Sequence, residues 1–387
     1  MVKIVTLIKE HIMERKNLSP SPDDTIGSII HLNSQYSSSD KPRLYSIEFL
    51  RLIFTFLIIF NHALPENLRM HISQAMGFSY PLFHPAYFGV ELFFIIAGFF
   101  LMENIKNYYI EPKTYINNLY LRIAPVFYLA TVLCILFASK SVFKIFTALV
   151  ILPGLSIPGQ VNGWGDWYIG VYFWIGIFYF LLLSKAYKQK MFIVLLLIYF
   201  GICLRINAPV QPGLIQLYTP LDGNYLSGLI GVSVIRGLYG MGIGILASFI
   251  LEYISFKKSK SLFVLYSIVE LVLLIVVLYF LIFNNKFDIL SKQIAFAIML
   301  MLFVNSCGIL SRTLNLLSKI NVFSKYCYSI FILHVVPINI LKMYKLSESE
   351  YVIFVFCIAT ILGILSYHLI EKPLLKKFKK TYVATTS

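Results

Sequence analysis

The amino-acid sequence predicts an all-α, polytopic membrane protein with about ten transmembrane helices and both termini in the cytoplasm. The chain has 387 residues, of which 58% are hydrophobic and 13% are charged, and its mean hydropathy is +0.78. A water-soluble domain does not need that much apolar surface, whereas a bundle of helices surrounded by lipid does. The net charge of +15 is interpreted as a mark of the cytoplasmic side of a membrane protein, and no nucleic-acid partner is expected.

Ten apolar stretches are long enough for a helix to cross the hydrocarbon core. A shorter apolar run at 142–153 is interpreted as an interfacial or re-entrant piece, because counting it as a span would invert the orientation of everything downstream. The predicted spans lie at about 46–64, 86–103, 121–138, 167–184, 191–206, 229–253, 262–283, 292–310, 325–341 and 351–370.

The basic residues set the predicted orientation. With the N-terminus inside, 24 of the 33 Lys and Arg residues fall on the cytoplasmic side. An even number of spans also places the basic segment Lys376–Lys380 inside, whereas eleven spans would place it outside. We therefore expect a multi-pass protein of the inner (plasma) membrane, surrounded by the lipid bilayer.

Composition divides the chain into three regions. Residues 1–44 are polar, with Ser-Pro-Ser-Pro at 19–22, and they contain no apolar stretch typical of a signal peptide. We expect this region to be a disordered cytoplasmic extension. Residues 45–375 form one membrane domain without a tandem repeat, and residues 376–387 form a basic cytoplasmic tail.

The first predicted span carries three ionisable residues, Glu48, Arg51 and His62. A charged side chain near the bilayer centre costs about 2.5–3.5 kcal/mol on insertion scales, so these residues need polar surroundings. In a helix, Arg51 and His62 lie about 20° apart around the axis and about 16 Å apart along it, and Glu48 lies about 60° from Arg51. The three groups therefore share a face that lines a polar cavity or packs against other polar helices.

Each of these residues has a structural and a chemical interpretation. His62 is a structural hydrogen bonder, a general base near neutral pH, or a nucleophile that carries an acyl group. Arg51 pairs with Glu48, anchors a phosphate or carboxylate that enters from the cytoplasm, or does both. Arg122, at the predicted cytoplasmic start of the third span, is a positive-inside residue when considered alone.

Four further residues are candidates for substrate binding. Glu91, in the second span, either pairs with a basic group or lines the acceptor side. Asp166 and Trp167 either belong to an interfacial belt or face an acceptor sugar. His334 is a second intramembrane histidine, either structural or functional, and it is the alternative candidate for the base.

Glycines in two spans predict close helix packing. Gly98 lies in the second span, and four glycines follow Arg236 in the segment 236–244 of the sixth span. Small residues let the backbones of two membrane helices approach closely, so we expect packing to be the role of these glycines.

Several short motifs, in this order along the chain, resemble those of the membrane acyltransferase 3 family, whose members O-acylate bacterial surface glycans. Arg51 and His62 match the first-helix motif of an Arg, ten residues and a His, and Glu48 matches an acidic residue three positions before the Arg. The likeness covers about residues 45–375. The other matching segments are Phe93–Phe99, Arg122–Pro125, Tyr328–His334 and Glu371–Pro373.

Three positions depart from the family pattern. Ala97 stands where the family has Ser, so a hydroxyl role is lost there. Leu119 stands where an Arg is usual, which weakens the implied grip on a donor phosphate. Tyr172 stands where a Glu usually follows the tryptophan, which changes the implied acceptor side.

The resemblance implies an integral-membrane O-acyltransferase of the cell envelope. Its donor would be cytoplasmic acyl-CoA, most often acetyl-CoA, and its acceptor a hydroxyl of an envelope polysaccharide, so the implied reaction is O-acetylation. Arg51 and Arg122 would hold the CoA phosphates, and His62 would act as the base, with Glu48 orienting Arg51. The residues expected to bind the acceptor are those singled out above by their positions in the sequence, Glu91, Asp166, Trp167 and His334.

Two other classes of protein stay open at this stage. Intramembrane charges also mark the path of a transporter or exporter of an anionic glycan or lipid, and a scaffold for glycan synthesis would tolerate the loss of His62. No metal is expected, because the sequence contains no motif with metal-ligand spacing. The oligomeric state is left open.

Overall fold

The computed structural model describes part of the chain. The chain divides into two units, Met1–Leu44 and Tyr45–Ser387, and all described residues except Leu44 belong to the second unit. The predicted extension before Leu44 and the tail after Lys376 lie outside the described residues. The described residues are 44–77, 85–108, 110–137, 146, 148–152, 155, 166–207, 232–254, 256, 259–282, 289–320 and 322–376.

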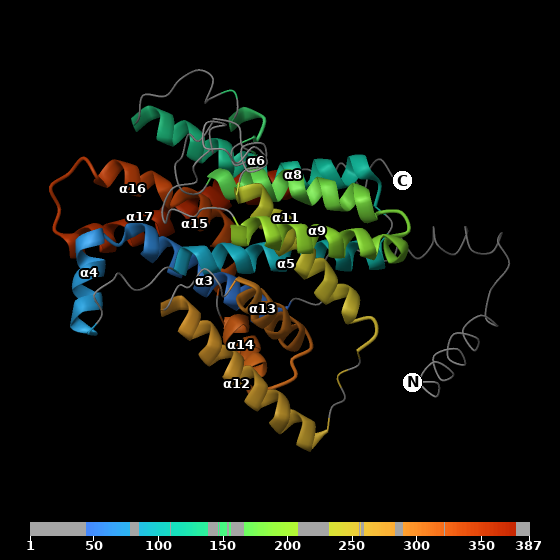
Figure 1. Cartoon of the computed structure of the whole chain (residues 1–387). Coiled ribbons are helices and arrows are strands. Elements are labelled where there is room, and N and C mark those ends of the chain that lie inside the picture. The colour runs from blue at the N-terminus through green and yellow to red at the C-terminus, as the bar shows by residue number, and fades with distance from the viewer. Residues whose placement is uncertain are drawn as a thin grey trace, which may run out of the picture. The chain divides into compact units, whose positions relative to one another are not determined.

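The second unit is helical, with no strand in its described parts (Figure 1). Two helices begin at prolines, Pro85 and Pro112, at the position where the missing backbone N–H costs nothing. Another begins at a capping box between Ser347 and Glu350. The longer elements are α3 (Tyr45–Ala63), α4 (Glu66–Ala75), α5 (Pro85–Asn107), α6 (Pro112–Phe137), α8 (Asp166–Leu183), α9 (Tyr187–Asn207), α11 (Val232–Ile250), α12 (Lys260–Ile282), α13 (Ile289–Val304), α14 (Ile309–Ile320), α15 (Cys327–Leu333), α16 (Val335–Leu341) and α17 (Glu348–Ser366), with a 3-10 turn η3 (Val322–Tyr326) before α15 and a π-helical turn η4 (Tyr367–Glu371) after α17.

The all-α membrane fold is confirmed. Each predicted span is helical over most of the part that the structure describes. By length and composition, six described helices can cross a membrane, or eight if each bent pair of helices counts as one span. The exact number of ten and the cytoplasmic termini stay predictions.

Two predicted spans are bent. In the predicted eighth span, helix α13 ends at Val304, and the next helix, α14, runs at 68° to it. Ser306 adopts a positive φ of 49° at this break. The buried Glu270 of α12 then accepts hydrogen bonds from the backbone N–H groups of Gly308 at 2.9 Å and Ser311 at 3.1 Å. A carboxylate stabilises the start of a helix, so Glu270 explains why α14 begins here. The ninth span bends by 47° between α15 and α16.

Some predicted loops contain further elements. Helix α4 lies in the predicted outer loop 65–85, and α14 covers most of the predicted loop after the eighth span. In the short apolar run 142–153, the indole of Trp174 donates to the Ile151 carbonyl at 3.0 Å. This contact ties the run to α8.

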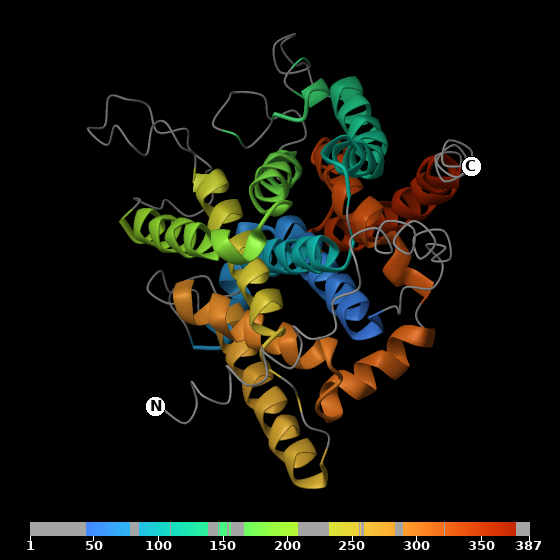
Figure 2. The same ribbon diagram turned by 90° about the vertical axis from the view of Figure 1, so that its right-hand side faces the viewer.

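Helix α3 lies among the other helices of the second unit (Figure 2). It contacts α5, α13, α14, α15 and α17, and Ile58 and Ile59 on it are completely buried. Packing against several neighbours gives the polar residues of α3 partners other than lipid.

Glycines bring α5 and α11 into direct backbone contact. A Cβ atom at Gly98 would lie 1.9 Å from the Met241 carbonyl oxygen, and one at Gly244 would lie 2.0 Å from the Ile95 carbonyl oxygen. Neither contact is physically possible. The predicted packing role of these glycines is therefore confirmed.

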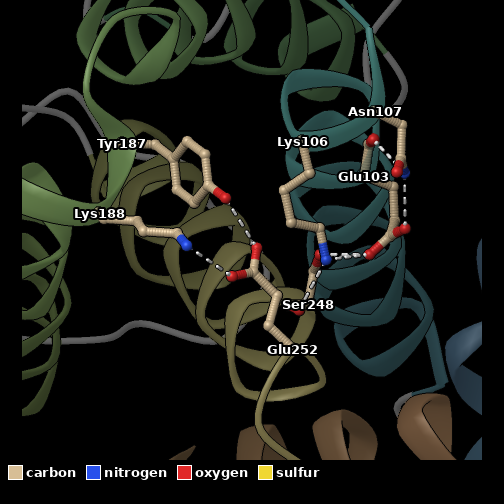
Figure 3. A network of polar contacts seen from close by, with 7 residues as sticks. All are labelled: Glu103, Lys106, Asn107, Tyr187, Lys188, Ser248 and Glu252. Atoms are coloured by element: carbon tan, nitrogen blue, oxygen red, sulfur yellow. Dashed lines mark hydrogen bonds and ion pairs between the residues drawn. The ribbon is translucent and has the colours of Figure 1, made fainter. Parts of the chain in front are cut away.

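Polar contacts tie the ends of α5, α9 and α11 together (Figure 3). Glu103 pairs with Lys106 at 2.5 Å and accepts from the Ser248 hydroxyl at 2.7 Å. Glu252 accepts from the Tyr187 hydroxyl at 3.0 Å. These contacts hold the helix pair joined by Gly98 and Gly244.

Candidate active site

The two intramembrane histidines meet. His62 is the second-last residue of α3, and His334 lies at the bend between α15 and α16. The Nδ1 atom of His62 lies 2.8 Å from Nε2 of His334, and the two rings stack with centroids 5.1 Å apart. His334 is completely buried, and His62 is half-buried. The bend places His334 against the end of α3.

The contacts of His334 determine the direction of this hydrogen bond. Its Nδ1 meets the carbonyl oxygen of Phe331, which can only accept, so Nδ1 carries a hydrogen. In a neutral ring Nε2 then has a lone pair, and it accepts from Nδ1–H of His62. The Nε2 atom of His62 is consequently the basic nitrogen of that ring.

Helix α4 folds back over this end of α3. The Arg69 guanidinium donates to the Asn61 carbonyl at 2.9 Å, and its positive charge acts on His62. The predicted outer loop therefore supplies a cation next to the histidine pair. Its sequence position, seven residues beyond His62 in a separate helix, did not indicate this role.

A second polar cluster forms around the predicted arginines. The charges of Arg51 on α3 and Arg122 on α6 both act on the Glu371 carboxylate and on the Tyr168 phenol. The Ser329 hydroxyl of α15 donates to Glu371 at 2.8 Å. Arg51 and Arg122 thus both act on the same carboxylate and the same phenol, although neither arginine forms an ion pair with Glu371 in the described chain. Their shared role in binding a donor stays a prediction.

One detail of the predicted arginine site is wrong. Glu48 and Arg51, both within the described chain, do not form an ion pair; the Glu48 carboxylate accepts instead from the Ser324 hydroxyl of η3 at 3.3 Å. Helix α6 begins at Pro112, about 15 Å before Arg122 along the axis, so Arg122 lies well inside this helix. The expected place of Arg122 at the cytoplasmic end of the span stays a prediction.

The histidine pair and the arginine cluster each include one residue of α3, His62 and Arg51. Arg51 lies eleven positions before His62, so these two side chains start about 16 Å apart along the helix.

Glu91 lies in a separate buried network. Its carboxylate pairs with Arg236 of α11 at 2.7 Å and accepts from Gln293 of α13 at 2.6 Å and from Tyr239 at 3.1 Å. The Arg236 guanidinium also lies 4.8 Å from the ring centroid of Trp167. Pairing with a basic group, one of the two interpretations of Glu91, is what the structure shows.

The predicted acceptor residues are therefore not one cluster. His334 joins His62, whereas Glu91 and Trp167 join the network around Arg236. Asp166 is the first residue of α8, and its side chain lies outside the described residues.

Sequence reasoning did not assign a site role to Glu371, Ser329 or Tyr168. A signal for the first two was present, because the Glu371–Pro373 and Tyr328–His334 segments belong to the motifs that carry the family resemblance. The π-helical turn that ends at Glu371 is a form often found at functional sites. Within the described ranges, no three metal-ligating side chains come together.

Buried polar groups inside a bundle of apolar helices define the class of this molecule: a polytopic membrane protein with an intramembrane polar site. A comparison with protein-family models matches residues 44–368 to the acyltransferase domain of the acyltransferase 3 family. The chain belongs to this family and is a membrane acyltransferase. A comparison with curated proteins finds no match.

Proposed function

We propose that the protein transfers an acyl group, in the first instance acetyl, from cytoplasmic acyl-CoA to a hydroxyl of an envelope polysaccharide. The observation that carries this proposal is the hydrogen bond between His62 and His334, because it leaves the basic nitrogen of His62 at Nε2. The family membership supports the acyl chemistry, and the arginine cluster supports a donor that carries phosphates.

In the proposed reaction, Nε2 of His62 takes the proton of the acceptor hydroxyl as the hydroxyl oxygen attacks the thioester carbonyl carbon. The carbon–sulfur bond then breaks, and CoA leaves as a thiolate. The proton taken from the hydroxyl stays on Nε2 of His62 at this point. Arg51 and Arg122 bind the CoA phosphates about 16 Å along α3 from His62. Arg69 places positive charge beside the thioester carbonyl oxygen, which becomes negative when the hydroxyl attacks.

A second route begins with attack of His62 itself on the thioester. That route forms an acyl-imidazole and releases CoA before the acceptor reacts. Rapid mixing of purified protein with acyl-CoA in the absence of acceptor distinguishes the two routes, because only the second gives a burst of one CoA per protein.

The experiment that tests the function measures transfer of labelled acetyl groups from acetyl-CoA to envelope glycans in membranes. His62→Gln keeps the size and hydrogen bonding of the side chain but lacks its basicity, so we expect transfer to fall by about 10²–10⁴. His71→Gln, on the exposed face of α4, is the matched control and should transfer normally. Full activity of His62→Gln would make His62 structural. Absence of any acyl transfer by the wild-type protein would favour a transporter.

A further inference from the structure

A cavity of about 460 Å³ lies between α12 and the break that separates α13 from α14. It shares no residue with the histidine pair or the arginine cluster. Three aromatic residues form much of its wall, and two of them, Phe256 and Tyr266, pack edge to face with ring centroids 5.6 Å apart. The third is Phe263.

Two cations, Lys260 and Arg312, also line the cavity. The Arg312 guanidinium lies 4.3 Å from the ring centroid of Phe263, and its Nε atom donates to the Ser306 carbonyl at 3.3 Å. In the part of the chain that the structure describes, neither cation forms an ion pair. The acidic residue of this region, Glu270, is completely buried and is engaged by the start of α14. An anion is therefore the complementary ligand.

The cavity adjoins a lipid-facing surface. Along α12, the exposed fractions are 57% for Val264, 55% for Ile268, 56% for Leu271 and 58% for Ile275. These residues repeat at the spacing of one helix face, and α12 is apolar and long enough to cross a membrane. Val264 also lines the cavity. The apolar stripe therefore begins where the two cations lie.

We propose that this cavity binds the headgroup of an anionic phospholipid. Lys260 and Arg312 contact its phosphate, and its acyl chains lie along the stripe of α12 that starts at Val264. A soluble phosphate has no apolar part to match this stripe. Both cations belong to segments that the distribution of basic residues assigns to the cytoplasm, so the lipid is one of the inner leaflet.

Hydrogen bonds connect this cavity with the start of α3. Ser306, on the cavity wall, accepts from the Asn315 side chain at 2.7 Å. The Asn315 oxygen accepts in turn from the backbone N–H of Ser46 at 2.7 Å. A bound lipid thus stabilises the break before α14 and, through Asn315, the first turn of α3. We expect the lipid to raise the Tm of the whole protein.

The test is native mass spectrometry of the full-length protein in detergent, with added phosphatidylglycerol or with phosphatidylcholine of the same acyl chains. We expect one phosphatidylglycerol to be retained and phosphatidylcholine to be lost. Each charge near the surface contributes about 1 kcal/mol, which is roughly a fivefold change in affinity. The double variant Lys260→Gln/Arg312→Gln should therefore bind phosphatidylglycerol roughly twenty-fivefold more weakly. Lys185→Gln, an exposed lysine between α8 and α9, should bind as the wild type does.

Lys260→Glu provides a second variant, since Lys260 is an exposed residue at the start of α12 and its replacement leaves the packing intact. It should also lose phosphatidylglycerol and the rise in Tm. Equal retention of the two lipids, or unchanged binding by Lys260→Glu, would overturn the proposal. Displacement of the lipid by inorganic phosphate would point to a free-phosphate site, and displacement by adenosine 3′,5′-bisphosphate to a nucleotide site; either result would also overturn it.

Discussion

Nδ1 of His62 and Nε2 of His334 lie 2.8 Å apart, although 272 residues separate them in the chain. His62 is the second-last residue of α3, and His334 lies at the bend of the α15–α16 pair. Because Nδ1 of His334 is engaged by the Phe331 carbonyl, His334 orients His62 and defines its tautomer. His334 is thus a positioning residue for the proposed base.

His334→Ala should lower the rate of acyl transfer roughly ten- to a hundredfold, because it leaves the Nδ1–H of the half-buried His62 without its acceptor. The KM for acyl-CoA should not change. His334→Gln places an oxygen near the position of Nε2 and should recover part of kcat. The measurement is steady-state transfer by the purified variants. A higher KM with an unchanged kcat would contradict the positioning role. Equal activity of the Ala and Gln variants would also contradict it.

Arg51→Ala and Arg122→Ala should each weaken acyl-CoA binding roughly ten- to a hundredfold, because a hydrogen bond to a charged group contributes about 1.5–3 kcal/mol. Acceptor binding should change less. Arg51→Lys should recover only part of the affinity if the guanidinium binds a phosphate through two hydrogen bonds. Binding is measured by calorimetry on purified protein, with Lys185→Ala as the control for loss of one exposed positive charge. Wild-type donor affinity in both Ala variants would remove the phosphate-anchoring role.

Gly98→Ala should destabilise the protein by about 1–3 kcal/mol, the usual cost of overpacking, since the new methyl group would meet the Met241 backbone at 1.9 Å. Gly244→Ala should behave in the same way against Ile95. Gly176→Ala is the matched control in α8, because its Cβ would approach only side chains, at 3.4 Å or more. The Tm of the three variants in detergent gives the comparison. If Gly98→Ala and Gly176→Ala had the same Tm, the backbones of α5 and α11 would not pack as closely as described.

Reporter fusions test the predicted topology. The distribution of basic residues places both the segment Lys185–Lys190 and the chain after Phe378 in the cytoplasm. Fusions of a cytoplasm-active reporter at both positions should be active, and fusions of a periplasm-active reporter should be silent. Opposite results at the two positions would exclude the ten-span arrangement.

The sequence could predict those parts of the site that depend on one helix. The shared face of Arg51 and His62 follows from the helical repeat, since the geometry within a helix is set by local hydrogen bonds. An ion pair between Glu48 and Arg51, one of the two interpretations of Arg51 drawn from the same repeat, does not form. Neighbouring positions on a helix allow a contact but do not require one, and here Ser324 binds Glu48 while the charge of Arg51 acts on Glu371.

The sequence by itself determined the all-α membrane fold and the long apolar helices, because long apolar runs and helical periodicity are properties of local chain chemistry. It also supplied each polar residue that needs a partner inside the bundle. Only the tertiary structure decided the partners: His334 for His62, Ser324 for Glu48, and Arg236 for Glu91. These choices depend on how distant helices bend and cross, and the breaks at Ser306 and His334 are stabilised by contacts between elements that no local pattern specifies.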